Sequence, residues 1–372
     1  MATPGTFVVR RGRLLCYRVL DIGDEVQLEH ADRLLRGTPG HRRVRPSRQG
    51  SESLAFAAPP LSVDAGRRSI DLPRAGRRVL ADVAVHVYDY GAASVAFDLE
   101  IQAGTPLTDL GPLCDELYDT PVLEAHARAV AADLIPRMAP AIQGLHEWPG
   151  VETYTVIFVE ELDGAPTAAE VLAMPGLAKL LLGETGAGTI SAAERADVLK
   201  HAYSYFEHDL AVIDWNSAFV LEPSGSRDIP DILEFASSQL LELRYYDTLL
   251  DGELARIYDE FAAAKRRFWS LLWSPYGTLA RDVQKRLVEL TEFTERVENA
   301  LKIIGDFYLA RVYRSAVRRF RMPSWQESVY RKQALVAQVY TLLKGELDIR
   351  RTTLLELTIV LLIVFEIVMA FL

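Results

Sequence analysis

The strongest constraint on the fold is an apolar run in residues 354–372, because few protein environments accept so many apolar side chains in succession. Sixteen of these nineteen residues are apolar, and fourteen of the sixteen are Leu, Ile, Val or Phe. As a helix the run is about 28 Å long at ~1.5 Å per residue, close to the ~30 Å hydrocarbon core of a bilayer. The sequence therefore predicts a C-terminal transmembrane helix. The alternative is a buried helix of a helical bundle.

The charges around this run predict its orientation. Arg350 and Arg351 lie close before it, separated from it by two threonines. The positive-inside rule then places the N-terminal bulk of the chain in the cytoplasm, or in the matrix of an organelle. Glu356 is expected at the membrane interface. Glu366 is expected near the centre of the span, where an acid favours contact with other helices and hence self-association. The sequence thus predicts a single-pass membrane protein that is anchored in the lipid bilayer by residues 350–372 and forms homo-oligomers.

Four further regions precede this anchor. They are a strand and a helix in residues 1–35, a basic loop rich in Pro, Gly and Arg in residues 36–80, an α/β domain in residues 81–230, and a helical bundle or coiled coil in residues 231–349. The fold class is α+β, with an α/β head, a helical region and the transmembrane helix in succession. Within the head, two β-rich runs flank Tyr90-Gly91 and predict a hairpin. The apolar run over residues 151–162 predicts another strand, and the spacing of Ser191 and Glu194 predicts that Ser191 caps a helix.

The helical region carries a heptad pattern. Apolar residues recur at a mean spacing of 3.5 over residues 233–264, and a second such seam covers residues 283–308. This spacing is typical of coiled coils and antiparallel bundles. Asp247 interrupts the first seam and has several polar neighbours in the sequence. These polar candidates are Glu234, Gln239, Glu242, Arg244, Tyr246 and Asp247.

Two interpretations of these six residues remain open. In the first, they form a polar layer that fixes the register of packed helices, as single buried polar residues do in coiled coils. In the second, they line a pocket that binds a partner or carries catalysis. Asp214 and Trp215 follow a strand-like segment and are predicted to belong to the core of the head.

Cofactor and metal chemistry find little support in the sequence. Cys16 and Cys114 are too few for a disulfide scaffold or a four-cysteine zinc site. His201 and His208 fall on one predicted helix but about 10 Å apart, too far to share a zinc ion. Residues 81–264 contain 32 acidic and 8 basic side chains, which argues against nucleic acid as a partner. We therefore expect no catalytic residues, no cofactor and no metal site.

A family resemblance rests on the stretch over residues 231–254. It reads DILEFASSQLLELRYYDTLLDGEL, and four further stretches agree with it in order: residues 86–97, residues 205–223, the predicted helix with Trp325, and the C-terminal run. In these stretches the chain resembles bacterial members of the required-for-meiotic-nuclear-division family. The resemblance implies similarity to mitochondrial inner-membrane proteins that support translation as oligomeric tethering factors. It implies no catalytic residues.

Two functions are consistent with these observations. The first is a membrane-tethered, oligomeric scaffold that has no catalytic activity and holds an unknown protein partner near the bilayer. The alternative is a metal-dependent enzyme that acts at the membrane through an acidic pocket in residues 81–264.

Overall fold

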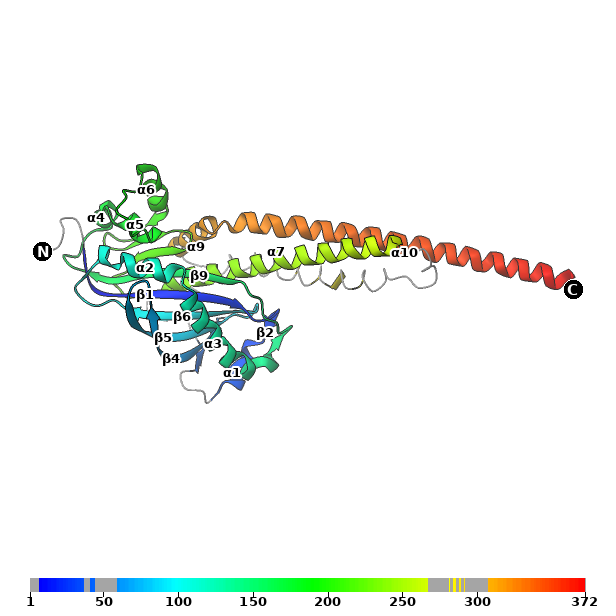
Figure 1. Cartoon of the computed structure of the whole chain (residues 1–372), viewed down its shortest axis with the longest axis horizontal. Coiled ribbons are helices and arrows are strands. Elements are labelled where there is room, and N and C mark those ends of the chain that lie inside the picture. Colours follow the sequence, from blue (N-terminus) through cyan, green and yellow to red (C-terminus); the bar gives the residue numbers. More distant parts are fainter. Residues whose placement is uncertain are drawn as a thin grey trace. The chain divides into compact units, whose positions relative to one another are not determined.

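The computed structural model describes residues 7–36, 41–43, 59–266 and 307–371, with the isolated helical residues 281, 284, 285, 288 and 291. The chain divides into two compact units (Figure 1). The head comprises Met1–Tyr245 and Val297–Pro323. The helical unit comprises Tyr246–Arg296 and Ser324–Leu372. Most of the predicted second seam, residues 283–308, lies outside the described residues.

A mixed sheet of ten strands forms the centre of the head. Its strands are β1 (Val8–Asp21), β3 (His41–Arg43), β4 (Leu61–Leu72), β5 (Arg77–Val87), β6 (Ala92–Glu100), β7 (Thr105–Pro106), β9 (Val151–Leu162), β10 (Ala202–Tyr203), β11 (Leu210–Ile213) and β12 (Ser217–Leu221). Their order is β10-β11-β12-β9-β1-β6-β5-β4-β3, and β7 also pairs with β1. Strands β12 and β9 are parallel, and the other pairs are antiparallel. β2 (Glu25–Val26) and β8 (Ile142–Gln143) form a separate two-stranded sheet.

Strand β1 is the central strand, although it is the first in sequence. It pairs with β6 on one side and with β9 on the other. Its residues 14–21 are all buried, because both faces of the sheet are covered there. Three arginines in the first half of the strand are paired with acids on neighbouring segments. These pairs are Arg10–Asp163, Arg11–Glu160 and Arg13–Asp98.

The predicted hairpin is confirmed by β5 and β6, which pair around Tyr90-Gly91. Gly91 has φ +98°, and a Cβ there would lie 1.7 Å from the carbonyl oxygen of Gly23. The turn therefore requires glycine. The predicted strand at residues 151–162 is confirmed by β9. The predicted loop over residues 36–80 instead contains β4, whose alternating buried side chains pack on the sheet and whose exposed side carries arginines.

Short helices pack against the sheet and supply its main apolar core (Figure 1). They are α1 (Leu28–Leu34), α2 (Gly111–Tyr118), α3 (Pro121–Met138), α4 (Ala168–Ala173), α5 (Leu177–Leu182) and α6 (Ala192–Val198), with 3-10 turns at Leu107–Leu110, Ala139–Ala141 and Leu199–His201. Ser191 caps α6 by accepting from the backbone N–H of Glu194, as the sequence spacing indicated. The helix ends at Val198, so His201 and His208 do not share a helix.

Arg18 of β1 is fully buried beneath α2. Its Nη1 donates to the carbonyl of Tyr17 at 2.9 Å, and its Nη2 donates to the carbonyl of Leu117 at 2.7 Å. Leu117 lies in the last turn of α2, where unpaired carbonyls give the helix end a partial negative charge. Burial lowers the pKa of Arg18. The contact joins the central strand to the layer of helices that covers it.

Two further helices contribute to the head. They are α7 (Asp228–Arg266), whose first half belongs to the head, and α9 (Phe307–Arg319). Arg319 of α9 binds the fully buried carboxylate of Asp214 at 2.6 Å and the exposed carboxylate of Asp197 at 2.8 Å. Asp214 is thus a core residue, as predicted. The prediction for Trp215 is wrong, because this side chain is 61% exposed in the turn between β11 and β12.

The helical unit contains the second half of α7 and most of α10 (Met322–Phe371). Leu250 and Ile257 of α7 are buried, as are Val329 and Val336 of α10. Between the two helices, Lys332 binds Asp247 at 2.8 Å and Asp251 at 2.7 Å. Ser328 also donates to Asp247, at 2.7 Å. The seam therefore tolerates Asp247 because α10 supplies its counter-ion.

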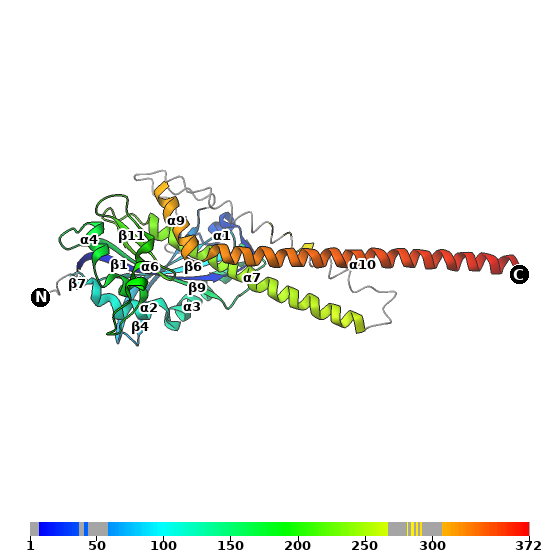
Figure 2. The same ribbon diagram turned by 90° about the horizontal axis from the view of Figure 1, so that it is seen from above.

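The predicted transmembrane helix is wrong. Helix α10 is continuous to Phe371 (Figure 2), yet no helix within the described ranges is both long and apolar enough to cross a membrane. Two acids also interrupt the apolar run of α10. Glu356 and Glu366 leave only nine residues between them, about 13 Å of helix against a hydrocarbon core of ~30 Å. The membrane anchor, the single-pass topology and the localisation inferred from it all fall with this span.

The ion pair between Arg319 and Asp214 gives a test of the head. Arg319→Met would leave the carboxylate of Asp214 buried without a counter-ion, which should lower the free energy of unfolding by about 3–5 kcal/mol. Arg318→Met, at the adjacent exposed position, is the matched control and should change it by less than about 0.5 kcal/mol. Urea unfolding followed by circular dichroism measures both. Equal stability of the two variants would contradict the assignment.

Lys332 pairs with two acids of different exposure and so provides an internal comparison. Asp247 is nearly buried, whereas Asp251 is 62% exposed. Asp247→Leu should therefore destabilise the helical unit by about 1–3 kcal/mol, because it strands two polar partners on α10. Asp251→Leu should cost less than about 1 kcal/mol. A higher melting temperature for Asp247→Leu than for the parent chain would show that the acid only disturbs the seam.

Candidate functional site

An acidic pocket lies in the head, between the start of α7 and strands β1, β4, β5 and β6. Its volume is about 350 Å³, within the lower range of small-molecule sites. Its charged lining residues are Asp64, Arg67, Asp82, His86, Asp98, Arg227, Asp231 and Glu234. Five of these are carboxylates and two are arginines, so the lining carries a net negative charge.

One side of the acidic pocket is a row of alternating charges across the sheet. Asp82 and Asp98 occupy directly opposed positions of β5 and β6, where like charges repel each other. Arg13 contacts both carboxylates, and Arg67 binds Asp82 at 2.7 Å. Arg227, which precedes α7, binds Asp98 at 2.8 Å. These arginines neutralise the pair and fix the first turn of α7 on the sheet.

The other side is a buried histidine–glutamate pair. His86 Nδ1 lies 2.7 and 2.9 Å from the two carboxylate oxygens of Glu234 and donates to them. Burial opposes a positive charge on His86, but the Glu234 carboxylate outweighs burial and raises the pKa of the imidazole. Glu234 itself is almost fully buried. The pair therefore holds a fixed ring orientation at the pocket wall.

Asp231 lies one turn before Glu234 on the same face of α7. Burial, reinforced by the negative charge of Glu234, raises the pKa of Asp231 from its ordinary 3.8 to about 7. Among the described parts of the chain, no partner hydrogen-bonds to its carboxyl group. A carboxyl group that exchanges its proton near neutral pH and faces a cavity can act as a general acid or base, or can bind a cation.

The six polar residues selected from the sequence do not converge on one site. Glu234 lines the acidic pocket, whereas Gln239 accepts from the Tyr313 hydroxyl of α9. Arg244 binds Glu152 at 2.6 Å. The remaining three are the buried Glu242 and Tyr246 and Asp247, which pairs with Lys332. The residues whose partners are known therefore each hold α7 against a different segment. They are Glu234, Gln239, Arg244 and Asp247.

Sequence reasoning missed Asp82, His86 and Asp98, although a signal for two of them was present. Asp82 and Asp98 each lie eight residues from Tyr90. A hairpin centred on Tyr90-Gly91 must therefore place them opposite each other, as the structure does. No comparable signal exists for His86, because its partner Glu234 lies 148 residues away in sequence.

A second candidate site is the apolar surface of α10 in the helical unit. Each described side chain from Thr341 onward is exposed. The large apolar residues of this surface are 49–65% exposed, and we refer to them as the α10 apolar surface. They are Leu355, Leu357, Ile359, Val360, Leu361, Leu362, Ile363, Val364, Phe365, Ile367, Val368 and Met369. Glu356 and Glu366 are exposed on the same segment, while the side chains of Arg350 and Arg351 lie outside the described ones.

No metal centre is apparent in the part of the chain that the structure describes, since no three His, Cys, Asp or Glu side chains there are placed to hold one ion.

The raised pKa of Asp231 generates a pH prediction. The folded state binds this proton more tightly than the unfolded chain, so Asp231 favours folding at pH 4 and loses that contribution as the pH rises to about 7. Asp231→Asn should therefore be the more stable protein above pH 7, by no more than about 4 kcal/mol. Its stability should also fall less between pH 4 and 7. Denaturant unfolding at each pH measures this, with the exposed Asp133→Asn as control. Parallel pH profiles for Asp231→Asn and the parent chain would contradict the assignment.

Comparisons with known proteins bear on the head. Residues 11–227 match the family described as uncharacterised protein MJ0711, N-terminal domain. The chain is also similar to the uncharacterised protein MJ0711 of Methanocaldococcus jannaschii, with 28% identity over 180 residues, which is 47% of this chain and 52% of that protein. The chain thus spans about half the length of the curated relative it matches. No solved structure matches the chain.

These matches correct the resemblance drawn from residues 231–254. That stretch begins beyond the matched residues, and nothing in the comparisons indicates the meiotic-nuclear-division family or its relation to mitochondrial translation. Heptad-patterned helical segments share spacing and polar interruptions without common descent, so the stretch was a weak basis for a family. Because the match to residues 11–227 covers more than half of the sequence, the chain belongs to the family of the uncharacterised protein MJ0711, N-terminal domain.

Proposed function

We propose that the protein is a non-catalytic scaffold that self-associates through the α10 apolar surface. The observation that carries this proposal is the continuous exposure of twelve large apolar side chains on one helix. Exposed apolar surfaces of this extent mark interaction sites in monomeric proteins. A helix that is apolar on all sides is ordinarily a buried one.

A second copy of the chain is the occupant that fits this surface. Apolar side chains at consecutive positions 359–365 surround the helix, so a flat partner would cover only one side. Identical helices packed in a bundle cover several sides at once. Burying half of the exposed area of these residues would contribute on the order of 10 kcal/mol per helix. That is comparable to the roughly 4–15 kcal/mol cost of association.

Self-association would bring several heads together, and the acidic pocket is then the site for a partner. Its net negative charge suits a positively charged segment of another protein. Asp231, with no hydrogen-bonding partner in the described chain, would accept hydrogen bonds from a lysine or arginine side chain. Several linked pockets would bind a multivalent partner more tightly than one pocket alone.

The same pocket supports a second candidate function, an enzyme that uses proton transfer. The specific observation is the pair formed by Asp231, with a pKa of about 7, and the oriented imidazole of His86. Groups that exchange protons near neutral pH are the ones that general acid–base catalysis requires. An activity whose pH–rate profile has a limb near pH 7, and which Asp231→Asn abolishes, would favour this function over the scaffold.

The proposed self-association is tested in the full chain by the double variant Val360→Glu/Val364→Glu. Two charges on adjacent turns of the apolar surface should abolish association, because each would be desolvated in a helix bundle. Ala334→Glu/Gln338→Glu, at exposed positions with the same spacing on α10, is the matched control and should associate as the parent chain does. Sedimentation velocity over a hundredfold range of concentration measures the mass. A parent chain that stays monomeric, or that associates as strongly with both charges in place, would refute the proposal.

A further inference from the structure

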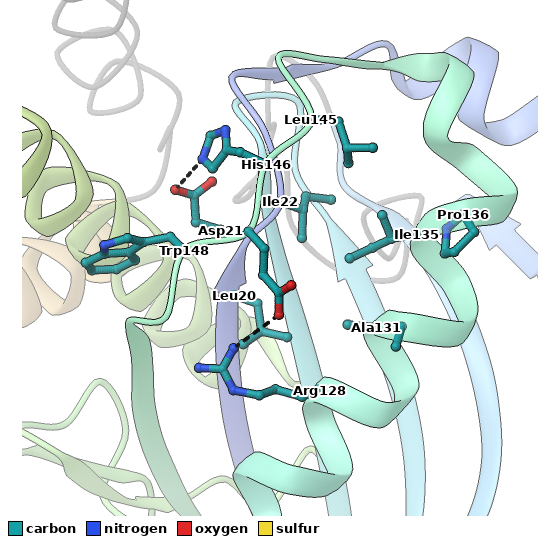
Figure 3. A pocket seen from close by; sticks show the side chains of 12 residues that line it. Leu20, Asp21, Ile22, Arg128, Ala131, Ile135, Pro136, Leu145, His146 and Trp148 are labelled. Carbon is teal, nitrogen blue, oxygen red and sulfur yellow. Dashed lines mark hydrogen bonds and ion pairs between the residues drawn. The ribbon is translucent and has the colours of Figure 1, made fainter.

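A second cavity in the head has a different character from the acidic pocket (Figure 3). It lies between the end of β1, helix α3 and the loop over residues 144–150, and its volume is about 470 Å³. Ile22, Ile135 and Leu145 form one wall, and Trp148 lies across from them (Figure 3). Leu145 is 51% exposed, so part of this apolar wall is open to solvent.

The polar end of this cavity is rigid. Asp21 is buried and accepts from the backbone N–H of Gly23 at 3.2 Å and from His146 Nε2 at 3.0 Å. The other ring nitrogen of His146 donates to the carbonyl of Gly144 at 2.7 Å. The imidazole also stacks on Tyr245, with ring centroids 4.8 Å apart. The hydrogen bond to Asp21 raises the pKa of His146. Both groups are therefore occupied within the protein and shape the cavity without being free to bind a ligand.

The remaining charges at the rim are unbalanced. Arg128 binds Glu124 at 3.0 Å and donates to the carbonyl of Pro149. Glu147 is 87% exposed, and its carboxylate lies 4.0 Å from the guanidinium of Arg128. Asp24 lies 3.7 Å from the imidazole of His146. These described residues at and beside the rim thus contribute four carboxylates, including that of Asp21, against one guanidinium and one imidazole.

We propose that this cavity binds a small primary amine that carries an apolar chain of several carbons. The chain would lie against Ile22, Ile135 and Leu145, and the ammonium group would reach the carboxylate of Glu147. An apolar cavity with one accessible polar group is the usual form of a small-molecule site. The excess of carboxylates selects a cationic head over an anionic one.

Titration of the full chain with n-octylamine, 1-octanol and octanoate tests both parts of the proposal. Calorimetry measures the affinity, and the fluorescence of Trp148 reports the location. This fluorescence is the emission that the parent chain has and Trp148→Phe lacks. A ligand bound elsewhere should leave it unchanged. The amine should bind most tightly and octanoate most weakly. Shortening the amine should weaken binding about fourfold per methylene, the value expected for buried CH₂ groups. Octanoate binding as tightly as octylamine, or no Trp148 signal with the amine, would overturn the proposal.

Two variants at exposed positions separate the contributions without endangering the fold. Glu147→Gln should weaken octylamine binding about two- to fivefold and leave octanol binding unchanged. Leu145→Ser should weaken both ligands. Glu207→Gln, an exposed glutamate away from the cavity, is the control for net charge and should alter neither. An equal loss of octylamine affinity in Glu147→Gln and Glu207→Gln would show that general electrostatics, and not this site, attracts the amine.

Discussion

The pairing of β1 on both of its edges is the interaction on which the rest of the head depends. The strand enters between β6 and β9, so it joins the β3–β6 half of the sheet to the half that ends in β10. Both partners are synthesised later, at residues 92–100 and 151–162, and the sheet therefore closes through long-range contacts. The side chains of β1 also contact segments on both faces of the sheet. Arg18 binds the end of α2, while Arg13 contacts the acids at the acidic pocket. One strand thus positions the helices and the candidate site together.

Some acidic side chains of the head are buried in ion pairs rather than exposed to solvent. Residues 81–264 are strongly acidic, yet the buried carboxylates of Asp214 and Glu234 each meet a basic group from a distant segment. Breaking such a pair leaves an uncompensated buried charge, which costs far more than losing a surface ion pair. Asp231 differs from both, since no group within the described residues hydrogen-bonds to its carboxyl group, although burial raises its pKa. This contrast is why the acidic pocket is the candidate site of the head and the other acids are structural.

Local features were predictable from the sequence, and long-range ones were not. The Tyr90-Gly91 turn, the strand at residues 151–162 and the Ser191 cap each depend on neighbouring residues, and each is confirmed. The exposure of Trp215 depends on the position of β11 and β12 in the sheet, and no local sequence pattern specifies that position. Strand β4 was not predicted, because the arginines on its exposed side made this segment resemble a basic loop. The apolar run of α10 suggested a membrane span, because hydropathy alone does not distinguish lipid from protein as the environment of an apolar helix.

Site-directed cross-linking tests the self-association of α10 most directly. Cys16 and Cys114 are buried, so a cysteine placed at Ile363 would be the reactive one. If copies of α10 pack together, mild oxidation of Ile363→Cys should give a covalent dimer on a non-reducing gel, because paired helices bring equivalent positions within the ~4.4–6.8 Å between Cα atoms that a disulfide requires. Ala334→Cys, on the part of α10 near its buried residues, should give little. Equal amounts of covalent dimer from both variants, or no covalent dimer from Ile363→Cys, would contradict a scaffold assembled through α10.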